Sequence, residues 1–131
     1  MTETFVDSSF WIALLNPRDA MHGMAARCAC PPKLVTTTAI ILEVMGAFSS
    51  RKYRPIAVEF RKSHDVDPTL AIVPLRNELL ELSLKLFHAR TDKDWSFTDC
   101  ISFVTMQERG INDALTADHH FEQAGFQILL R

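Results

Sequence analysis

The sequence of 131 residues lacks the features that mark several classes of protein. No apolar run approaches the roughly 20 residues of a membrane span, and no basic segment precedes an apolar one near the N-terminus. We therefore expect neither a signal peptide nor a membrane anchor, and a cytoplasmic location. The three cysteines form an odd set without a Cys-x-x-Cys pair, which favours reduced thiols and argues against a zinc site. Internal repeats and low-complexity segments are also missing, so the length predicts one domain spanning residues 1–131.

An excess of positive charge is missing too, since a net charge of −2 provides no general attraction to nucleic acid. Basic residues are nevertheless concentrated between positions 51 and 62, where Glu59 is the single acid among them. These basic residues are Arg51, Lys52, Arg54, Arg61 and Lys62. A local run of this kind can hold a phosphate backbone, and it can equally be the solvated face of a helix.

What the sequence does contain is a regular alternation of short strands and helices. Strands are predicted at residues 4–6, 34–37, 70–73, 113–117 and 127–130. Helices are predicted at residues 10–15, 22–30, 39–50, 55–65, 76–89 and 97–109, with a short one around residue 121. Such alternation favours an α/β fold, in which a single-domain parallel β-sheet is flanked by α-helices on both faces, as three layers.

Asp7 and Asp118 occupy equivalent positions, because each follows the last residue of a predicted strand. Open parallel sheets bind ligands at the carboxyl ends of their strands, so both carboxylates are expected at that edge. For Asp118 the alternative is that it only caps the short helix that follows. Asp113 begins the same strand and is expected about 16 Å away at the opposite edge, which excludes it from the site.

Glu43 and Asp99 are predicted on helices that follow the same edge. Glu43 is the only ionisable residue between positions 38 and 50, and its neighbours at i±3 and i±4 are apolar or small. Burial of an isolated carboxylate requires a partner, so this position indicates a site unless the side chain is simply exposed. Asp99 completes a Ser96-x-x-Asp99 pattern, which is typical of a helix cap and compatible with a side chain that also faces the site.

Two other groups of polar residues are interpreted as surface features. Asp92 and Asp94 resemble a metal-binding Asp-x-Asp pair, but a lysine separates them and no glycine follows, so exposed loop charges are expected. His119 and His120 adjoin Asp118 and could contact a phosphate or a metal. Histidines at such positions are more often exposed at a helix end, and that is the expectation here.

Convergence of Asp7, Glu43, Asp99 and Asp118 at one edge has an electrostatic consequence. Four carboxylates would repel one another, raising at least one of their pKa values, unless divalent cations neutralise them. Ligand sets made of oxygen atoms select Mg²⁺ or Mn²⁺ rather than zinc. Such ions activate water and stabilise the charge that develops on a phosphodiester, so the four acids indicate a phosphodiester hydrolase.

Four segments that contain these acids resemble the PIN-domain nucleases, and among them the bacterial VapC-type toxins. The segments are residues 5–15, 37–44, 96–103 and 115–121, and the resemblance covers essentially the whole chain. It implies a Mg²⁺/Mn²⁺-dependent single-strand endoribonuclease in which Asp7, Glu43, Asp99 and Asp118 hold the metal. It also implies that Ser96 supports the site, that the toxin is a homodimer, and that a cognate antitoxin inserts a peptide near the active site.

One segment departs from the family pattern, because many relatives carry a further acid near the position of His120. Two other functional classes also remain open. An acid-pocket phosphotransfer domain, such as a receiver or a phosphatase, would need a second acid near Asp7, where Ser8 and Ser9 follow instead. The other is a PIN-fold protein that binds or processes RNA without a toxin role. Intact acids at all four positions argue against a PIN-fold module that has lost catalysis.

Overall fold

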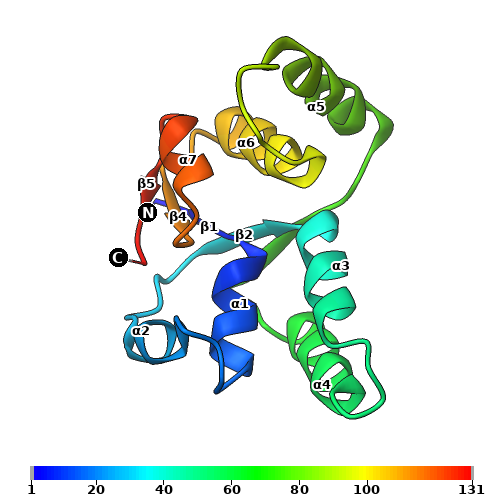
Figure 1. Cartoon of the computed structure of the whole chain (residues 1–131), viewed down its shortest axis with the longest axis vertical. Helices are drawn as coiled ribbons and strands as arrows, with labels where there is room; N and C mark the ends of the chain where they lie inside the picture. Colours follow the sequence, from blue (N-terminus) through cyan, green and yellow to red (C-terminus); the bar gives the residue numbers. More distant parts are fainter. Residues whose placement is uncertain (1, 131) are drawn as a thin grey trace.

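The strands of the chain pair into one parallel sheet (Figure 1). The computed structural model describes residues 2–130. Its strands are β1 (Thr4–Val6), β2 (Leu34–Thr37), β3 (Leu70–Val73), β4 (Asp113–Leu115) and β5 (Gln127–Ile128). Their order is β3-β2-β1-β4-β5, and every neighbouring pair is parallel. The parallel sheet predicted from the sequence is confirmed, with β1 at its centre.

Helices connect successive strands and cover both faces of the sheet. They are α1 (Ser8–Leu15), α2 (His22–Arg27), α3 (Thr38–Ala47), α4 (Arg54–Asp65), α5 (Asn77–Ala89), α6 (Phe97–Arg109) and α7 (His119–Gln123). The chain moves from β1 outward to β3, and then returns across the sheet to β4 and β5. Because crossovers between parallel strands are right-handed, this reversal places later helices on the other face. Figure 1 shows α1 to α4 below the sheet and α5 to α7 above it. Within residues 2–130, no helix combines the length and apolar character that a membrane crossing requires.

Apolar side chains from both helical layers pack against the sheet. All three residues of β1 are buried, as expected for a central strand covered on both faces. The Phe5 ring lies 6.2 Å from that of Phe121 on α7, which in turn meets Phe103 on α6 edge-on at 5.0 Å. These contacts fasten α6 and α7 to the sheet. Both helices begin at the carboxyl edge of the strands, so their first residues lie where ligands bind in such folds.

Some element boundaries differ from the sequence prediction. β4 ends at residue 115 rather than 117, because Thr116 turns the chain and donates its N–H to the Ala114 carbonyl at 3.0 Å. α1 begins at residue 8 rather than 10, and α2 ends at residue 27 rather than 30, where Cys28 takes an extended conformation. α3 begins at residue 38 rather than 39, and Thr37 supplies its side-chain cap. The shift at β4 matters most, because it places a hydroxyl group between two of the predicted acids.

Candidate active site

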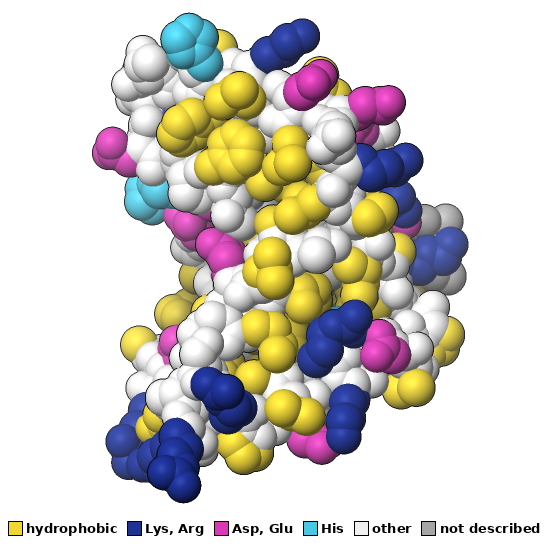
Figure 2. All heavy atoms as spheres, turned by 90° about the vertical axis from the view of Figure 1, so that its right-hand side faces the viewer, with side chains coloured by type: hydrophobic (Ala, Val, Ile, Leu, Met, Phe, Trp, Pro, Cys, Tyr) yellow, Lys and Arg dark blue, Asp and Glu magenta, His cyan; other side chains and the backbone are white. Residues whose placement is uncertain are grey.

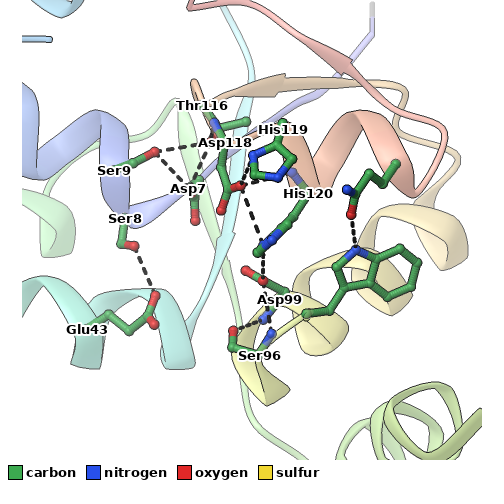
Figure 3. Close-up of polar contacts among 12 residues, drawn as sticks. Asp7, Ser8, Ser9, Glu43, Ser96, Asp99, Thr116, Asp118, His119 and His120 are labelled. Atoms are coloured by element: carbon green, nitrogen blue, oxygen red, sulfur yellow. Dashed lines mark hydrogen bonds and ion pairs between the residues drawn. The ribbon is translucent and has the colours of Figure 1, made fainter. Parts of the chain in front are cut away.

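The four predicted acids come together at the carboxyl edge of the sheet, each from a different element (Figure 3). Asp7 follows β1, Asp118 precedes α7, Glu43 lies on α3, and Asp99 lies in the first turn of α6. β1 and β4 are neighbours in the sheet, which brings the first and last of these acids close together. The alternation of strands and helices therefore brings together four acids that are far apart in the sequence.

Asp7 is the buried member of the cluster, with 6% of its surface exposed. Its Oδ2 atom accepts hydrogen bonds from the hydroxyl groups of Ser9 (2.8 Å) and Thr116 (2.9 Å), which lie 3.1 Å from each other. Burial raises the pKa of the Asp7 carboxyl, the two hydroxyl donors oppose this rise, and the charge of Asp99 adds to it. The expected increase in at least one pKa is confirmed, although burial contributes more to it than repulsion between the acids.

Thr116 is a site residue that the sequence analysis missed. It is fully buried, and its Oγ1 atom donates to Asp7 Oδ2 while accepting the N–H of Asp118 at 3.0 Å. One hydroxyl group thus fixes the side chain of one acid and the backbone of another. The available signal was a threonine two residues before Asp118, which the longer predicted strand had concealed as an ordinary strand residue.

Glu43 points toward the cluster from α3, and its Oε1 atom accepts a hydrogen bond from the Ser8 hydroxyl at 2.9 Å (Figure 3). The residue is exposed, as the alternative interpretation of Glu43 expected. Removal of part of its hydration nevertheless raises the pKa of the Glu43 carboxyl, and the charges of Asp7 and Asp99 add to the rise. Glu43 is therefore exposed and also faces the candidate site.

Asp99 performs both of the roles weighed for it. The Ser96 hydroxyl accepts the Asp99 N–H at 3.0 Å, and Asp99 Oδ2 accepts the Ser96 N–H at 3.0 Å, which completes a capping box. The same Oδ2 atom lies 3.1 Å from Nδ1 of His120. Ser96 therefore supports the site by holding Asp99 in place.

Asp118 is the N-cap of α7, as its alternative interpretation proposed, and it also faces the cluster. Its Oδ1 atom accepts the His120 N–H at 2.9 Å and lies 3.5 Å from the ring atom Nδ1 of the same residue. The prediction of an exposed helix-end histidine is right for His119, whose side chain is 71% exposed. It is wrong for His120, whose side chain is only 22% exposed and lies between Asp99 and Asp118.

The acids that the sequence analysis excluded from the site are Asp113, Asp92 and Asp94. Asp113 is paired in register with Thr4, at the amino edge of the sheet, where it lines a polar cavity of about 550 Å³ together with Glu3 and Arg109. Asp92 and Asp94 are exposed as predicted, and Asp92 is paired with the guanidinium of a neighbouring arginine.

The arrangement of oxygen atoms fits a divalent cation. Within residues 2–130, the ion pairs of the four acids involve only histidines, and no lysine or arginine neutralises them. Glu43, Asp99 and Asp118 each hold one oxygen by a hydrogen bond, while the second oxygen accepts none from the described residues. Clustered carboxylates that keep an oxygen free are the donors that hard divalent ions bind.

The basic residues between positions 51 and 62 are all exposed. Arg61 is paired with Asp65 at 2.6 Å, and Arg54 donates to the Ser49 carbonyl at 2.9 Å, so part of the run serves the helix itself. Arg51 and Lys62 form no ion pair with any residue in the range 2–130. Figure 2 shows a hollow on the left of the molecule with acidic side chains at its edge, and lysine and arginine side chains gathered below it.

Comparison with known proteins places this geometry in a family. The profile of the PIN domain matches residues 4–127. A relative from Mycobacterium tuberculosis, the 23S rRNA-specific endonuclease VapC20, is 31% identical over 123 residues, which make up 93% of this chain and 94% of that protein.

Solved structures agree with the sequence match. The crystal structure of M. tuberculosis VapC20, described as a sarcin-ricin loop cleaving toxin, superposes with a TM-score of 0.89 at 29% identity, covering 98% of this chain and 99% of that one. A toxin–antitoxin complex from Klebsiella pneumoniae shares the fold, with a TM-score of 0.67 at 17% identity over 96% of this chain and 95% of that one. The family profile, the sequence relative and the superposition agree: the chain belongs to the PIN-domain family, as a homologue of the VapC20 toxin.

Proposed function

We propose that this protein is a divalent-metal-dependent endoribonuclease that acts as the toxin of a type II toxin–antitoxin pair. The observation that carries the proposal is the convergence of Asp7, Glu43, Asp99 and Asp118 at one edge of the sheet without a lysine or arginine to neutralise them. A cluster of this composition is suited to Mg²⁺ or Mn²⁺. The M. tuberculosis relative is a 23S rRNA-specific endonuclease, which supports an activity on RNA.

Each residue of the cluster has a role that its contacts support. Asp7, Glu43, Asp99 and Asp118 are the proposed ligands, and the bound cation would supply activation of water and stabilisation of charge on the scissile phosphate. Ser9 and Thr116 orient the Asp7 carboxylate, because both hydroxyl groups donate to its Oδ2 atom. Ser8 orients Glu43 through its hydroxyl group, which donates to Oε1, and the backbone N–H of Ser96 orients Asp99 by donating to Oδ2.

Large-subunit ribosomal RNA is the proposed substrate class. The support is the 23S rRNA specificity stated for the relative, whose structure covers this chain almost completely. The basic residues would hold the RNA backbone beside the acids, since exposed lysines and arginines bind phosphates independently of sequence. These residues are Arg51, Lys52, Arg54, Arg61 and Lys62. Arg51 and Lys62 are the strongest candidates, because the others already contact groups of the protein.

Two protein partners are proposed, a second copy of the chain and a cognate antitoxin. Leu42 on α3 is 60% exposed, and Leu84 and Phe87 on α5 are 57% and 45% exposed. Figure 2 shows hydrophobic side chains gathered over the face on which these helices lie. An apolar surface of this kind is typical of a protein interface, and a homodimer would cover it. The support for an antitoxin is that structural neighbours were solved as toxin–antitoxin complexes.

Cleavage of purified 23S rRNA tests the proposed activity. We expect the wild-type protein to produce discrete fragments in Mg²⁺ or Mn²⁺ and none in excess EDTA. Asp7→Asn should abolish the fragments, whereas Asp94→Asn, which removes an exposed loop carboxylate, should leave them unchanged. Undiminished cleavage in EDTA, or cleavage by the Asp7→Asn protein at the wild-type rate, would refute the proposed metal-dependent activity.

A further inference from the structure

One histidine lies inside the acid cluster, between two of the proposed metal ligands. His120 Nδ1 is 3.1 Å from Asp99 Oδ2 and 3.5 Å from Asp118 Oδ1 (Figure 3). The two acids come from different elements, α6 and the segment before α7, so the ring bridges them. Its neighbour His119 has a far more exposed side chain and lies 3.7 Å from Asp118.

The spacing of these atoms matches that of ligands around one ion. Two ligands at right angles around an ion, each about 2.1 Å from it, are separated by about 3.0 Å. The Nδ1 atom of His120 is at nearly this separation from one oxygen of Asp99 and one of Asp118. The His120 nitrogen is thus at ligand distance from one oxygen of each of two proposed metal ligands, and in both it is the oxygen that also accepts a capping N–H group.

A nitrogen donor changes which ion the site favours. Mg²⁺ takes oxygen ligands almost exclusively and is reluctant to give up water, whereas first-row transition ions accept imidazole readily. Mn²⁺ has the same charge and still accepts carboxylate oxygens, so a site with several carboxylates and one imidazole suits it better than it suits Mg²⁺.

We propose that His120 is a direct metal ligand that gives this site a preference for Mn²⁺ over Mg²⁺. The proposal deepens the proposed function and rests on it, because the same acids hold the ion. Metal binding to the RNA-free protein separates it from any effect on catalysis. Titration calorimetry with each ion would be performed on the wild type, His120→Asn, His120→Asp and the matched control His119→Asn.

The wild type and His119→Asn should bind Mn²⁺ with a clear preference over Mg²⁺. The ratio of the two affinities should fall by roughly tenfold or more in His120→Asn, and also in His120→Asp, which restores an oxygen donor. Comparison of ratios removes any general loss of affinity, and thermal unfolding in EDTA checks that each variant is folded. If one variant does not fold, the other still provides the comparison.

Pulsed electron paramagnetic resonance of bound Mn²⁺ provides the direct readout. Coupling to an imidazole nitrogen should be present in the wild type and in His119→Asn, and absent in His120→Asn. A bound Mn²⁺ ion without nitrogen coupling, or an affinity ratio that does not change in either His120 variant, would overturn the role of His120 and leave the metal-dependent activity standing. If the wild type binds neither ion, or if Asp7→Asn binds both ions as well as the wild type does, the proposed function is refuted and this inference with it.

Discussion

Replacement of Thr116 by valine tests whether the acid cluster is organised as the contacts indicate. Valine keeps the shape of threonine but removes the hydroxyl group that donates to Asp7 Oδ2 and accepts the N–H of Asp118. Asp7 is buried, so water cannot replace the lost donor easily. We expect the variant to fold, to be less stable, and to lose most of its cleavage activity, because two proposed ligands lose their common support.

The size of the destabilisation should depend on pH. A hydrogen bond to a charged group is worth about 1.5–3 kcal/mol, and one between neutral groups about 1 kcal/mol. Burial raises the pKa of Asp7 above its unfolded value, and loss of a donor to the carboxylate raises the pKa further. A raised folded-state pKa lowers stability at high pH, and this penalty disappears as pH falls below the unfolded value of about 3.9. The extra destabilisation of Thr116→Val should therefore be largest near neutral pH and shrink by about 1 kcal/mol in acid.

Urea unfolding in EDTA, at several pH values from about 8 to about 4, measures this difference. Thr105→Val is the matched control, since Thr105 is also buried but donates to the neutral carbonyl of Ile101 at 2.8 Å. Its destabilisation should not vary with pH. The loss of the acceptor for the Asp118 N–H contributes equally at every pH and cancels from the slope. If the free-energy difference between Thr116→Val and wild type is the same at all pH values, Thr116 does not act through the charge of Asp7.

Three further outcomes follow from the contacts of the cluster and of the basic residues. In EDTA, Asp7→Asn should melt at the same temperature as the wild type or at a higher one, since it removes a buried charge. Mn²⁺ should raise the melting temperature of the wild type only, which melting curves with and without the ion will show. Ser96→Ala should lose about 1 kcal/mol of stability, measured by urea unfolding, because no hydroxyl group accepts the Asp99 N–H, and it should cleave more slowly because the first turn of α6, which carries Asp99, loses its cap. Neutralising Arg51 and Lys62 together should flatten the salt dependence of RNA binding, measured by filter retention. An unchanged slope would mean that both residues are only solvated surface charges.

The part of the site that follows from strand and helix order could be predicted from the sequence. Asp7 directly follows β1 and Asp118 follows β4 after a short turn, and parallel strands present all their carboxyl ends at one edge. The exclusion of Asp113 rests on the same geometry and holds in the structure. Glu43 was identified by the absence of other charges on its helix, which is a property of the sequence alone.

The contacts that depend on exact spacing could not be predicted in this way. Thr116 donates a hydrogen bond to Asp7, from which it is separated by more than a hundred residues in the sequence. The contact depends on the end of β4 at residue 115. Strand ends are determined by local hydrogen bonds of the turn, which a hydrophobic pattern does not specify. His120 was expected at the surface, as His119 was, because histidines at a helix end are more often exposed. One step along a short helix separates the exposed ring of His119 from the ring of His120, which lies between two acids.

Helix capping and metal binding are often weighed against each other when a sequence contains an acid at a helix start, and in the proposed site the two roles are compatible. Asp99 uses Oδ2 to cap α6, and Asp118 uses Oδ1 to cap α7. Each cap fixes the carboxylate plane, so the second oxygen points in a defined direction without a further residue to hold it. A capping pattern at the carboxyl edge of a parallel sheet is therefore evidence for a site at that edge, because the cap supplies the rigidity that a ligand needs.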